Sequence, residues 1–347
     1  MSQIPLTNEA RHEALQRFGY TEREARFLCL AALHGGYFLR RQYDEFLGQR
    51  DGGSATQLIE KTLAKGHAGA FTYRPRISIY HLCARPFYNA LGQVDNRNRR
   101  QRQPLTVKNK LMALDFVLGH DGNNYLATEQ EKLAYFTGTL QLPVSALPLK
   151  LYHSTRSQAA TARYFVEKYP IFLSENAISG CPPVVSFCFV DEGQTTTSRF
   201  ETFLHQYSRL VGLLPAFRLI YVAATPVFFE SAGRAFDRFT RPENRLNGRV
   251  QDPEIGRVLE YFGARHRYET KQLDGFDRAK LIQLRQDREA FSGTEFEALY
   301  NHWKSVGDQA VTQEPAAETA ATASVQGTFS TCLLEYNYDL FGTLTAY

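Results

Sequence analysis

The chain has 347 residues, of which 43% are hydrophobic and 13% aromatic. This predicts a globular protein with at least one full core and two or more domains. The sequence has no run of about 18 uncharged apolar residues and no basic N-terminal segment followed by an apolar one. We therefore expect no membrane span, no secretory signal and a cytoplasmic location. Five scattered cysteines without C-x-x-C spacing argue against a disulfide framework or a structural zinc site.

Positive charge is concentrated in the first third of the chain, although the formal net charge is only +4. Residues 1–110 hold 18 lysines and arginines against 9 acidic residues, whereas residues 111–347 hold 22 against 27. This asymmetry indicates that one module meets a polyanion and that the other has a different task.

The first 66 residues have helical periodicity. Residues 21–34 carry apolar side chains at helical spacing, with Thr21 and Glu24 as a capping box and Gly35 and Gly36 at the end. A short helix over 39–47 is expected next.

A third helix is predicted from Ser54, which we expect to form a capping box with Gln57. Its inner face consists of four residues, Leu58, Ile59, Thr62 and Leu63. Its outer face is polar and basic, with Thr56, Gln57, Glu60 and Lys61. Such a set is typical of a recognition helix in the DNA major groove.

After Gly66 the apolar period changes to about two, which predicts a β-hairpin with Arg74 and Arg76 at its tip. Three helices followed by a hairpin are in the order of a winged helix, and we assign residues 1–94 to such a domain. A winged helix used for protein contacts is the alternative. The DNA-contacting side chains predicted in this domain are Arg40, Arg41, Thr56, Gln57, Lys61, Arg74 and Arg76.

The run "DNRNRRQRQP" over 95–104 has no apolar residue between Asp95 and Gln103, so we expect it not to pack into a core. It is predicted to be an arm along DNA phosphates, or else a solvated linker. Its candidate phosphate contacts are Arg97, Arg99, Arg100 and Arg102. Two helices, 104–120 and 128–140, complete a connector that ends near residue 144.

From residue 145 the pattern predicts short strands alternating with helices. The segments "LPLKLYH", "YPIFLS", "VVSFCFVDE" and "AFRLIYVAA" are typical of strands, and 198–214 is typical of an amphipathic helix. A strand, a helix and a second buried strand imply parallel pairing in an α/β sheet. The fold class is therefore mixed α/β.

The block "VSFCFVDEGQTTTSRFETFLHQYSRLVGLLPAFRLIYVAA", with the predicted winged helix before it, resembles the replication-relaxation family of mobile-element proteins. Members of that family look like an N-terminal winged helix followed by a restriction-endonuclease-like domain. The winged helix and the basic arm predict sequence-specific or structure-specific binding of double-stranded DNA. The resemblance implies that this binding serves the replication or transcriptional regulation of a plasmid, phage or other bacterial mobile element. It also implies that 145–306 is a nuclease-like domain with a helical extension.

Asp191 and Glu192 end the strand of this block, as carboxylates do in many metal-dependent nucleases. Phe189 stands where the family pattern has its first carboxylate, and Ile171 stands where a metal-binding Asp usually follows proline. Neighbouring strand residues point to opposite faces, so Asp191 and Glu192 are poorly placed to hold one ion. We expect Asp191 to turn the chain and Ser198 to cap the next helix. We also expect the domain to have no catalytic activity and to bind no metal cofactor.

Residues 253–305 are predicted to be helical, 307–328 to be a flexible linker, and 329–347 to be an anchored strand or docking peptide. The docking peptide is the predicted route to a homodimer or a protein partner. Two alternatives to non-catalytic DNA binding remain open: a Mg²⁺-dependent DNA nuclease using Asp191 and Glu192, and a non-catalytic assembly subunit.

Overall fold

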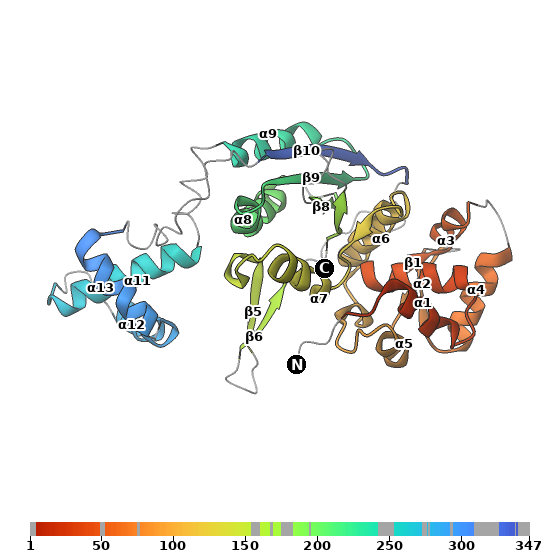
Figure 1. The fold of residues 1–347 in the computed structure, drawn as a ribbon, viewed down its shortest axis with the longest axis horizontal. Coiled ribbons are helices and arrows are strands. Elements are labelled where there is room, and N and C mark those ends of the chain that lie inside the picture. Colours follow the sequence, from red (N-terminus) through yellow and green to blue (C-terminus); the bar gives the residue numbers. More distant parts are fainter. Residues whose placement is uncertain are drawn as a thin grey trace. The chain divides into compact units, whose positions relative to one another are not determined.

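The computed structural model (Figure 1) is a mixed α/β protein, as predicted. It describes residues 5–48, 53–74, 77–153, 160–166, 169–174, 183–193, 196–241, 253–272, 276, 278–291, 294–308, 326–336 and 338. The chain divides into two compact units, Met1–Ala235 with Val325–Tyr347, and Phe236–Ser324. Over the described residues, none of the helices combines the length and apolarity that crossing a membrane requires.

The N-terminal part of the first unit combines helices with a small antiparallel sheet. Its elements are α1 (Asn8–Gln16), α2 (Glu22–His34), β1 (Tyr37–Leu39), α3 (Arg40–Phe46), α4 (Gly53–Ala64), β2 (Ala68–Arg74), β3 (Ile77–Leu82), α5 (Arg85–Ala90), the 3-10 turn η1 (Arg97–Arg99) and α6 (Pro104–Leu118). The strand order is β1-β3-β2. The hairpin β2–β3 is thus present, and the sequence pattern missed β1, a strand of three residues.

The helix boundaries test the predicted caps. The Thr21–Glu24 capping box is present. Helix α2 ends at His34, with Gly35 at the C-cap, and Gly36 has a φ of +80°. The predicted cap at Ser54 is wrong, because α4 begins at Gly53 and Ser54 lies within its first turn.

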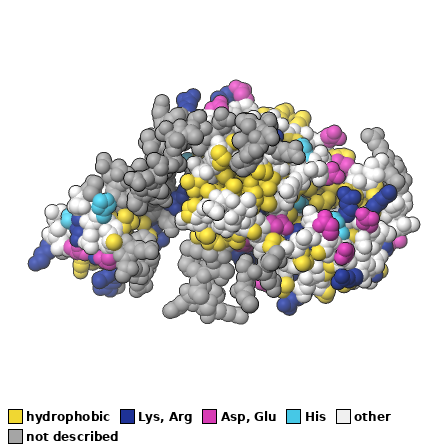
Figure 2. Space-filling model, viewed as in Figure 1, with side chains coloured by type: hydrophobic (Ala, Val, Ile, Leu, Met, Phe, Trp, Pro, Cys, Tyr) yellow, Lys and Arg dark blue, Asp and Glu magenta, His cyan; other side chains and the backbone are white. Residues whose placement is uncertain are grey.

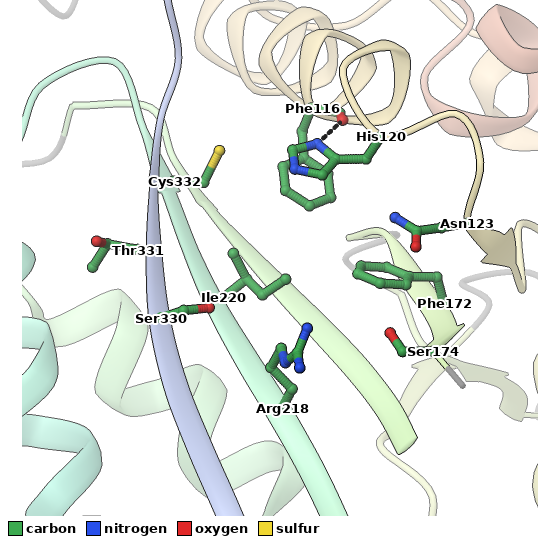
Figure 3. A pocket seen from close by; sticks show the side chains of 10 residues that line it. All are labelled: Phe116, His120, Asn123, Phe172, Ser174, Arg218, Ile220, Ser330, Thr331 and Cys332. Atoms are coloured by element: carbon green, nitrogen blue, oxygen red, sulfur yellow. Dashed lines mark hydrogen bonds between the residues drawn. The ribbon is translucent and has the colours of Figure 1, made fainter. Parts of the chain in front are cut away.

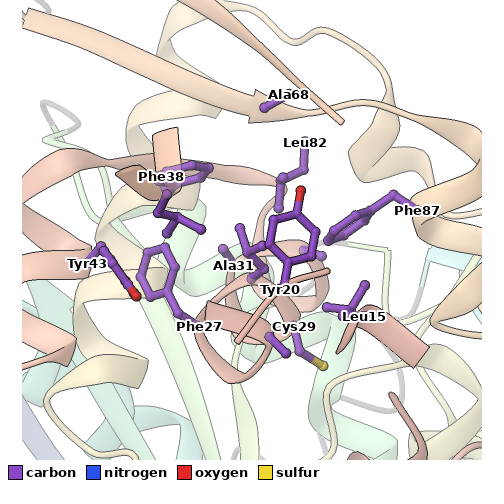
Figure 4. Packing of buried hydrophobic residues seen from close by; sticks show 14 of the residues in the cluster. Leu15, Tyr20, Phe27, Cys29, Ala31, Phe38, Tyr43, Ala68, Leu82 and Phe87 are labelled. Carbon is purple, nitrogen blue, oxygen red and sulfur yellow. The ribbon is translucent and has the colours of Figure 1, made fainter. Parts of the chain in front are cut away.

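Aromatic side chains fill the core under the small sheet (Figure 4). Phe27 of α2 lies edge-on to Phe38 of β1 at 5.5 Å between ring centroids, and contacts Tyr43 and Phe46 of α3 at 4.8 and 5.6 Å. The third helix contributes Leu58, which is fully buried. The core thus ties α2, α3, α4 and β1 together.

A five-stranded sheet forms the rest of the first unit. Its elements, with the pieces around them, are β4 (Asn124–Tyr125), α7 (Glu129–Leu133), the π-helix η2 (Ala134–Thr139), the 3-10 turn η3 (Val144–Ala146), the separate hairpin β5 (Leu149–His153) and β6 (Ala160–Tyr164), β7 (Ile171–Ser174), β8 (Val184–Asp191), α8 (Ser198–Gly212), β9 (Ala216–Ala223), α9 (Phe229–Thr240) and β10 (Gln326–Leu333). The order is β10-β9-β8-β7-β4. Strands β8 and β9 are parallel, which confirms the pairing expected from the strand, helix, strand pattern.

One face of this sheet is aromatic and covered by helices. Phe187 and Phe189 of β8 contact Tyr207 and Phe200 of α8 at centroid distances of 5.6 and 5.1 Å. Tyr221 of β9 contacts α9 from the same face. Helix α6 meets the other face, where Phe116 lies 6.2 Å from Phe172 of β7.

The C-terminal strand β10 closes the sheet. It pairs parallel to β9, with Phe329 opposite Leu219 and Leu333 opposite Ala223. Beyond it, Tyr338 is buried. The predicted anchored strand is therefore present, starting at Gln326, and it is anchored in its own chain; residues 309–325 and 339–347 lie outside the described part.

The second unit begins at Phe236, within α9, and contains α11 (Pro253–Glu269), α12 (Arg278–Ala290) and α13 (Thr294–Val306). Phe262 is fully buried and contacts Tyr300 and Trp303 of α13 at 5.1 and 5.9 Å. These helices bury their aromatic residues among themselves. They consequently form a unit of their own, whereas the sequence pattern groups them with the sheet in one domain.

Candidate nucleic-acid interface

The outer face of α4 is polar. Gln57 is exposed and Thr56 half-buried, in line with the predicted outer face. Lys61, however, places Nζ 2.6 Å from Oε2 of Glu24 and 3.4 Å from the carbonyl oxygen of Gly19. Lys61 thus joins α4 to α2. Leu63, which the pattern assigns to the core, is 38% exposed.

The two arginines that begin α3 have different roles. The side chain of Arg40 is 53% exposed and lies 3.8 Å from Asp44, one turn further along the helix. Asp44 is 16% exposed, but the guanidinium is mostly in solvent and the separation is long, so the pair contributes little and Arg40 is open to an anion. Arg41 turns inward and donates from both terminal nitrogens to Asp115 of α6, at 2.8 and 2.6 Å.

Arg41 belongs to a polar cluster between α3, α6 and the C-terminal segment. Tyr338 donates a hydrogen bond to Asp115, and the Arg41 guanidinium lies 3.7 Å from the ring centroid of Tyr336. Gln42 donates to Asp115 at 2.6 Å. Burial opposes the charge of Arg41, but its bonds to Asp115 outweigh this and raise its pKa. Arg41 is therefore a structural residue, contrary to its predicted role at the DNA.

The hairpin β2–β3 places Arg74 at the end of β2, paired with Ile77. The register shifts between Thr72 and Arg74, which marks an irregularity next to the tip. The side chain of Arg74 and all of Arg76 lie outside the described residues, so the predicted contacts of these two arginines stay predictions.

The segment 95–104 packs against the N-terminal core, and the expectation that it cannot pack is wrong. Asn98 is only 1% exposed and donates to the carbonyl oxygens of Ala32 and Leu33, at 2.9 and 3.3 Å, at the end of α2. Its own carbonyl oxygen lies 2.7 Å from Nε2 of His81. One buried amide thereby supplies the attachment that apolar side chains usually provide.

Packing of this segment leaves its arginines unequally placed. Arg100 is exposed, whereas Arg97, Arg99 and Arg102 are half-buried. Arg102 donates to the carbonyl oxygen of Arg97 at 3.3 Å, and its backbone N–H donates to the Tyr37 hydroxyl at 2.9 Å. Among the four predicted phosphate contacts, Arg100 is the most accessible.

Acidic side chains are interspersed with the basic ones over the N-terminal helices. Figure 2 shows Lys and Arg next to Asp and Glu on the right of the face in view, with no uniformly basic patch there. Ion pairs within this part of the chain include Lys61 with Glu24 and Arg40 with Asp44.

Asp191 and Glu192 are buried at the end of β8 and have different partners. Asp191 accepts from the backbone N–H of Gly193 at 2.9 Å and from the Tyr221 hydroxyl at 2.7 Å. Gly193 has a φ of +94°, so Asp191 turns the chain as predicted. Burial and the bond to Asp191 raise the pKa of Tyr221. The predicted cap by Ser198 is wrong, because α8 begins at Ser198 itself and the capping position is Thr197.

Glu192 pairs with Arg199 of α8 and accepts from Nδ2 of Asn109 at 3.3 Å. Local sequence did not reveal that α6 reaches this turn, where Nδ2 of Asn109 also donates to the carbonyl oxygen of Val190 at 2.9 Å. In the part of the chain that the structure covers, no three His, Cys, Asp or Glu side chains gather as a metal site. Each of the two carboxylates has hydrogen-bond partners within the chain: the Gly193 N–H and Tyr221 for Asp191, and Arg199 and Asn109 for Glu192.

Comparison with known proteins found no matching family model, no similar curated protein and no similar solved structure.

Proposed function

We propose that this protein binds double-stranded DNA through a winged helix made of α2, β1, α3, α4 and the hairpin β2–β3. The supporting observation is the order helix, strand, two helices, hairpin, with strand order β1-β3-β2. In a winged helix the third helix enters the major groove and the hairpin lies along the backbone or minor groove. The exposed Gln57 of α4 is the side chain best suited to a base edge, because a glutamine amide can pair with adenine.

Of the other predicted residues, some are proposed to contact DNA phosphates and one stabilises the fold. Arg40 and Arg100, both exposed, are proposed to bind phosphates, and Arg74 and Arg76 extend this set at the hairpin tip by their place in the sequence. The set favours phosphate binding because arginine can form two parallel bonds to phosphate oxygens. Arg41 is assigned to structural support.

The resemblance to the replication-relaxation family is the reason to propose service to a plasmid, phage or other mobile element. We assign no catalysis to the sheet, because Tyr221 and the Gly193 N–H hold Asp191, and Arg199 and Asn109 hold Glu192. The sheet then serves as a scaffold that carries the DNA-binding elements.

Fluorescence anisotropy with labelled duplexes at several salt concentrations tests this proposal. Replacing Arg40, Arg74, Arg76 and Arg100 together with glutamine should weaken binding to all duplexes. It should also lower the slope of log affinity against log salt by about one for each phosphate that is no longer neutralised. Gln57→Ala should instead weaken binding to a preferred sequence by about 1–3 kcal/mol.

Arg209→Gln is the matched control, because Arg209 is exposed on α8, outside the proposed interface. Equal affinity and equal salt slope in the fourfold variant and the parent would refute the proposal. Plasmid nicking with Mg²⁺ that disappears in Asp191→Asn would favour the nuclease alternative.

A further inference from the structure

A groove lies on the sheet face opposite α8, outside the proposed DNA-binding elements (Figure 3). It has a volume of about 320 Å³ and is bounded by the end of α6 and by strands β7, β9 and β10. This volume is near the lower end of the range for ligand pockets, about 300–1,000 Å³, and therefore suits a small ligand.

Among the described residues that line the groove, Arg218 is the one charged residue. It lies in β9 between Phe217 and Leu219, and Phe217 contacts Phe187 on the covered face. Because strand side chains alternate, Arg218 points to the opposite face, which carries the groove. It is exposed, and no carboxylate of the described chain pairs with it.

The strand around Arg218 makes this charge unusual. Strand β9 is central, between β8 and β10, and its sequence AFRLIYVA is otherwise apolar. In register with Arg218 are Ser186 and Thr328, which are small and uncharged. The five N–H donors of the guanidinium are therefore available to a ligand.

Small hydrogen-bonding groups surround the groove. The lining includes the hydroxyls of Ser174 and Ser330 and the amide of Asn123. Ser174 Oγ is 3.3 Å from Ser186 Oγ, which keeps it close to the row of Arg218. Among the described residues of the lining, the cation stands with neutral hydrogen-bonding groups and no carboxylate, which is a setting for an anion. The guanidinium fork matches phosphate oxygens.

The far end of the groove carries one exposed ring, that of His120, with buried aromatic rings behind it. The rings of Phe116 and His120 stack at 4.3 Å with an angle of 21°, and Phe172 lies beside them. His120 Nδ1 lies 2.8 Å from the carbonyl oxygen of Phe116, which orients the imidazole and leaves Nε2 available. In Figure 3 the His120 and Phe116 rings lie at one end and the Arg218 guanidinium at the other.

We propose that this groove binds a nucleoside monophosphate. The phosphate lies on Arg218 with the hydroxyls of Ser174 and Ser330. The base lies against the exposed ring of His120, because Phe116 and Phe172 are only 1% and 3% exposed. Base stacking on aromatic side chains tolerates any base, so purine and pyrimidine nucleotides both fit. This site is independent of the DNA-binding proposal, because it uses other residues.

Isothermal titration of the full chain with AMP, CMP, adenosine and inorganic phosphate tests the site. AMP and CMP should bind more tightly than either adenosine or phosphate alone. Arg218→Gln should weaken AMP binding about ten- to hundredfold, the loss expected for charged hydrogen bonds. His120→Ala should reduce the advantage of AMP over phosphate, because it removes the stacking surface and leaves Arg218.

Arg209→Gln on α8, at the other face of the sheet, should bind AMP like the parent chain. Thermal unfolding of each variant verifies that the fold is kept, which is expected because Arg218 and His120 are exposed. Equal AMP affinity in Arg218→Gln and the parent would overturn the proposal, and so would AMP binding no tighter than inorganic phosphate. A 5′-phosphorylated oligonucleotide that binds through Arg218 where AMP does not would also overturn it.

Discussion

The N-terminal helices and the five-stranded sheet build their cores from different materials. The N-terminal part buries many polar side chains, among them Glu24, His34, Gln42, His81, Asn98 and Asp115. The covered face of the sheet buries mostly rings, including Phe187, Phe189, Phe200, Phe203, Tyr207 and Tyr221. The first core depends on partners and protonation, whereas the second depends on the volume that its side chains fill.

The largest expected effect is in the aromatic core. Phe189 contacts the rings of Tyr169, Phe200, Phe203 and Tyr221 within 5.5 Å. Phe189→Ala should lower the free energy of unfolding by about 3–5 kcal/mol, because less apolar surface is buried and a cavity remains. Urea unfolding at pH 7 and pH 5.5 measures the loss, which should be the same at both values.

Val227→Ala is its control, since Val227 is 71% exposed, and should change stability by less than about 0.5 kcal/mol. If the loss of unfolding free energy in Phe189→Ala depended strongly on pH, the proposed difference between the two cores would be contradicted.

In the polar core, Asp115→Ala should cost about 3 kcal/mol. The substitution leaves Arg41, Gln42 and Tyr338 without their shared acceptor. Breaking a buried ion pair costs about 3–5 kcal/mol of unfolding free energy. We expect the lower value here, because the side chain of Arg41 is 28% exposed. Urea unfolding measures it, with Glu230→Ala as the exposed ion-pair control, for which less than about 0.5 kcal/mol is expected. Equal losses in the two variants would contradict the structural role of Arg41.

Acid should weaken the polar core through His34. Burial lowers the pKa of His34 from 6.5 to about 3. Below pH 6.5 the unfolded chain therefore binds a proton that the folded chain does not, and stability falls as pH falls toward 3. The contribution is at most about 1.4 kcal/mol per pH unit.

His34→Gln should remove this part of the slope, measured as unfolding free energy at pH 7, 6 and 5. His205→Gln on the exposed side of α8 should leave the slope unchanged. Identical slopes in His34→Gln and the parent would show that another group takes up the proton.

The smallest effect concerns the C-terminal segment. Tyr338→Phe removes the hydroxyl that donates to Asp115 and accepts from Arg41 at 3.2 Å. The expected loss is about 1 kcal/mol in urea unfolding. Tyr268→Phe, at a 52% exposed position, is the control. A change in oligomeric state without loss of stability would instead point to a role for this segment between copies of the chain.

Periodicity predicted the regular elements because it reports local burial. The capping box of α2, the hairpin β2–β3, and the parallel β8 and β9 around α8 all match it. It failed for β1, whose three residues are too few to show a period, and for the partner of β10, because strand pairing across about 110 residues leaves no local trace.

Site residues were harder to predict because their partners are distant in sequence. Arg41 has the composition of a DNA contact, and only the fold brings Asp115 to it. Asn98, in a run without apolar residues, is buried through hydrogen bonds that hydropathy does not register. Arg218 did leave a signal, as a lone charge within the apolar "AFRLIYVAA", but a strand pattern alone does not reveal which face is open.

The return of the chain from α13 to β10 has a consequence for synthesis. During translation β9 is the edge strand of the mixed sheet, and its partner β10 is made only after the helices α11, α12 and α13 have been completed. An unpaired apolar edge can recruit another strand. Rapid folding of the three-helix unit shortens the loop that β10 must close and so lowers the entropic cost of closure. The helical unit can therefore act as an internal folding aid, and slowing its folding should raise aggregation of nascent chains before it affects the finished protein.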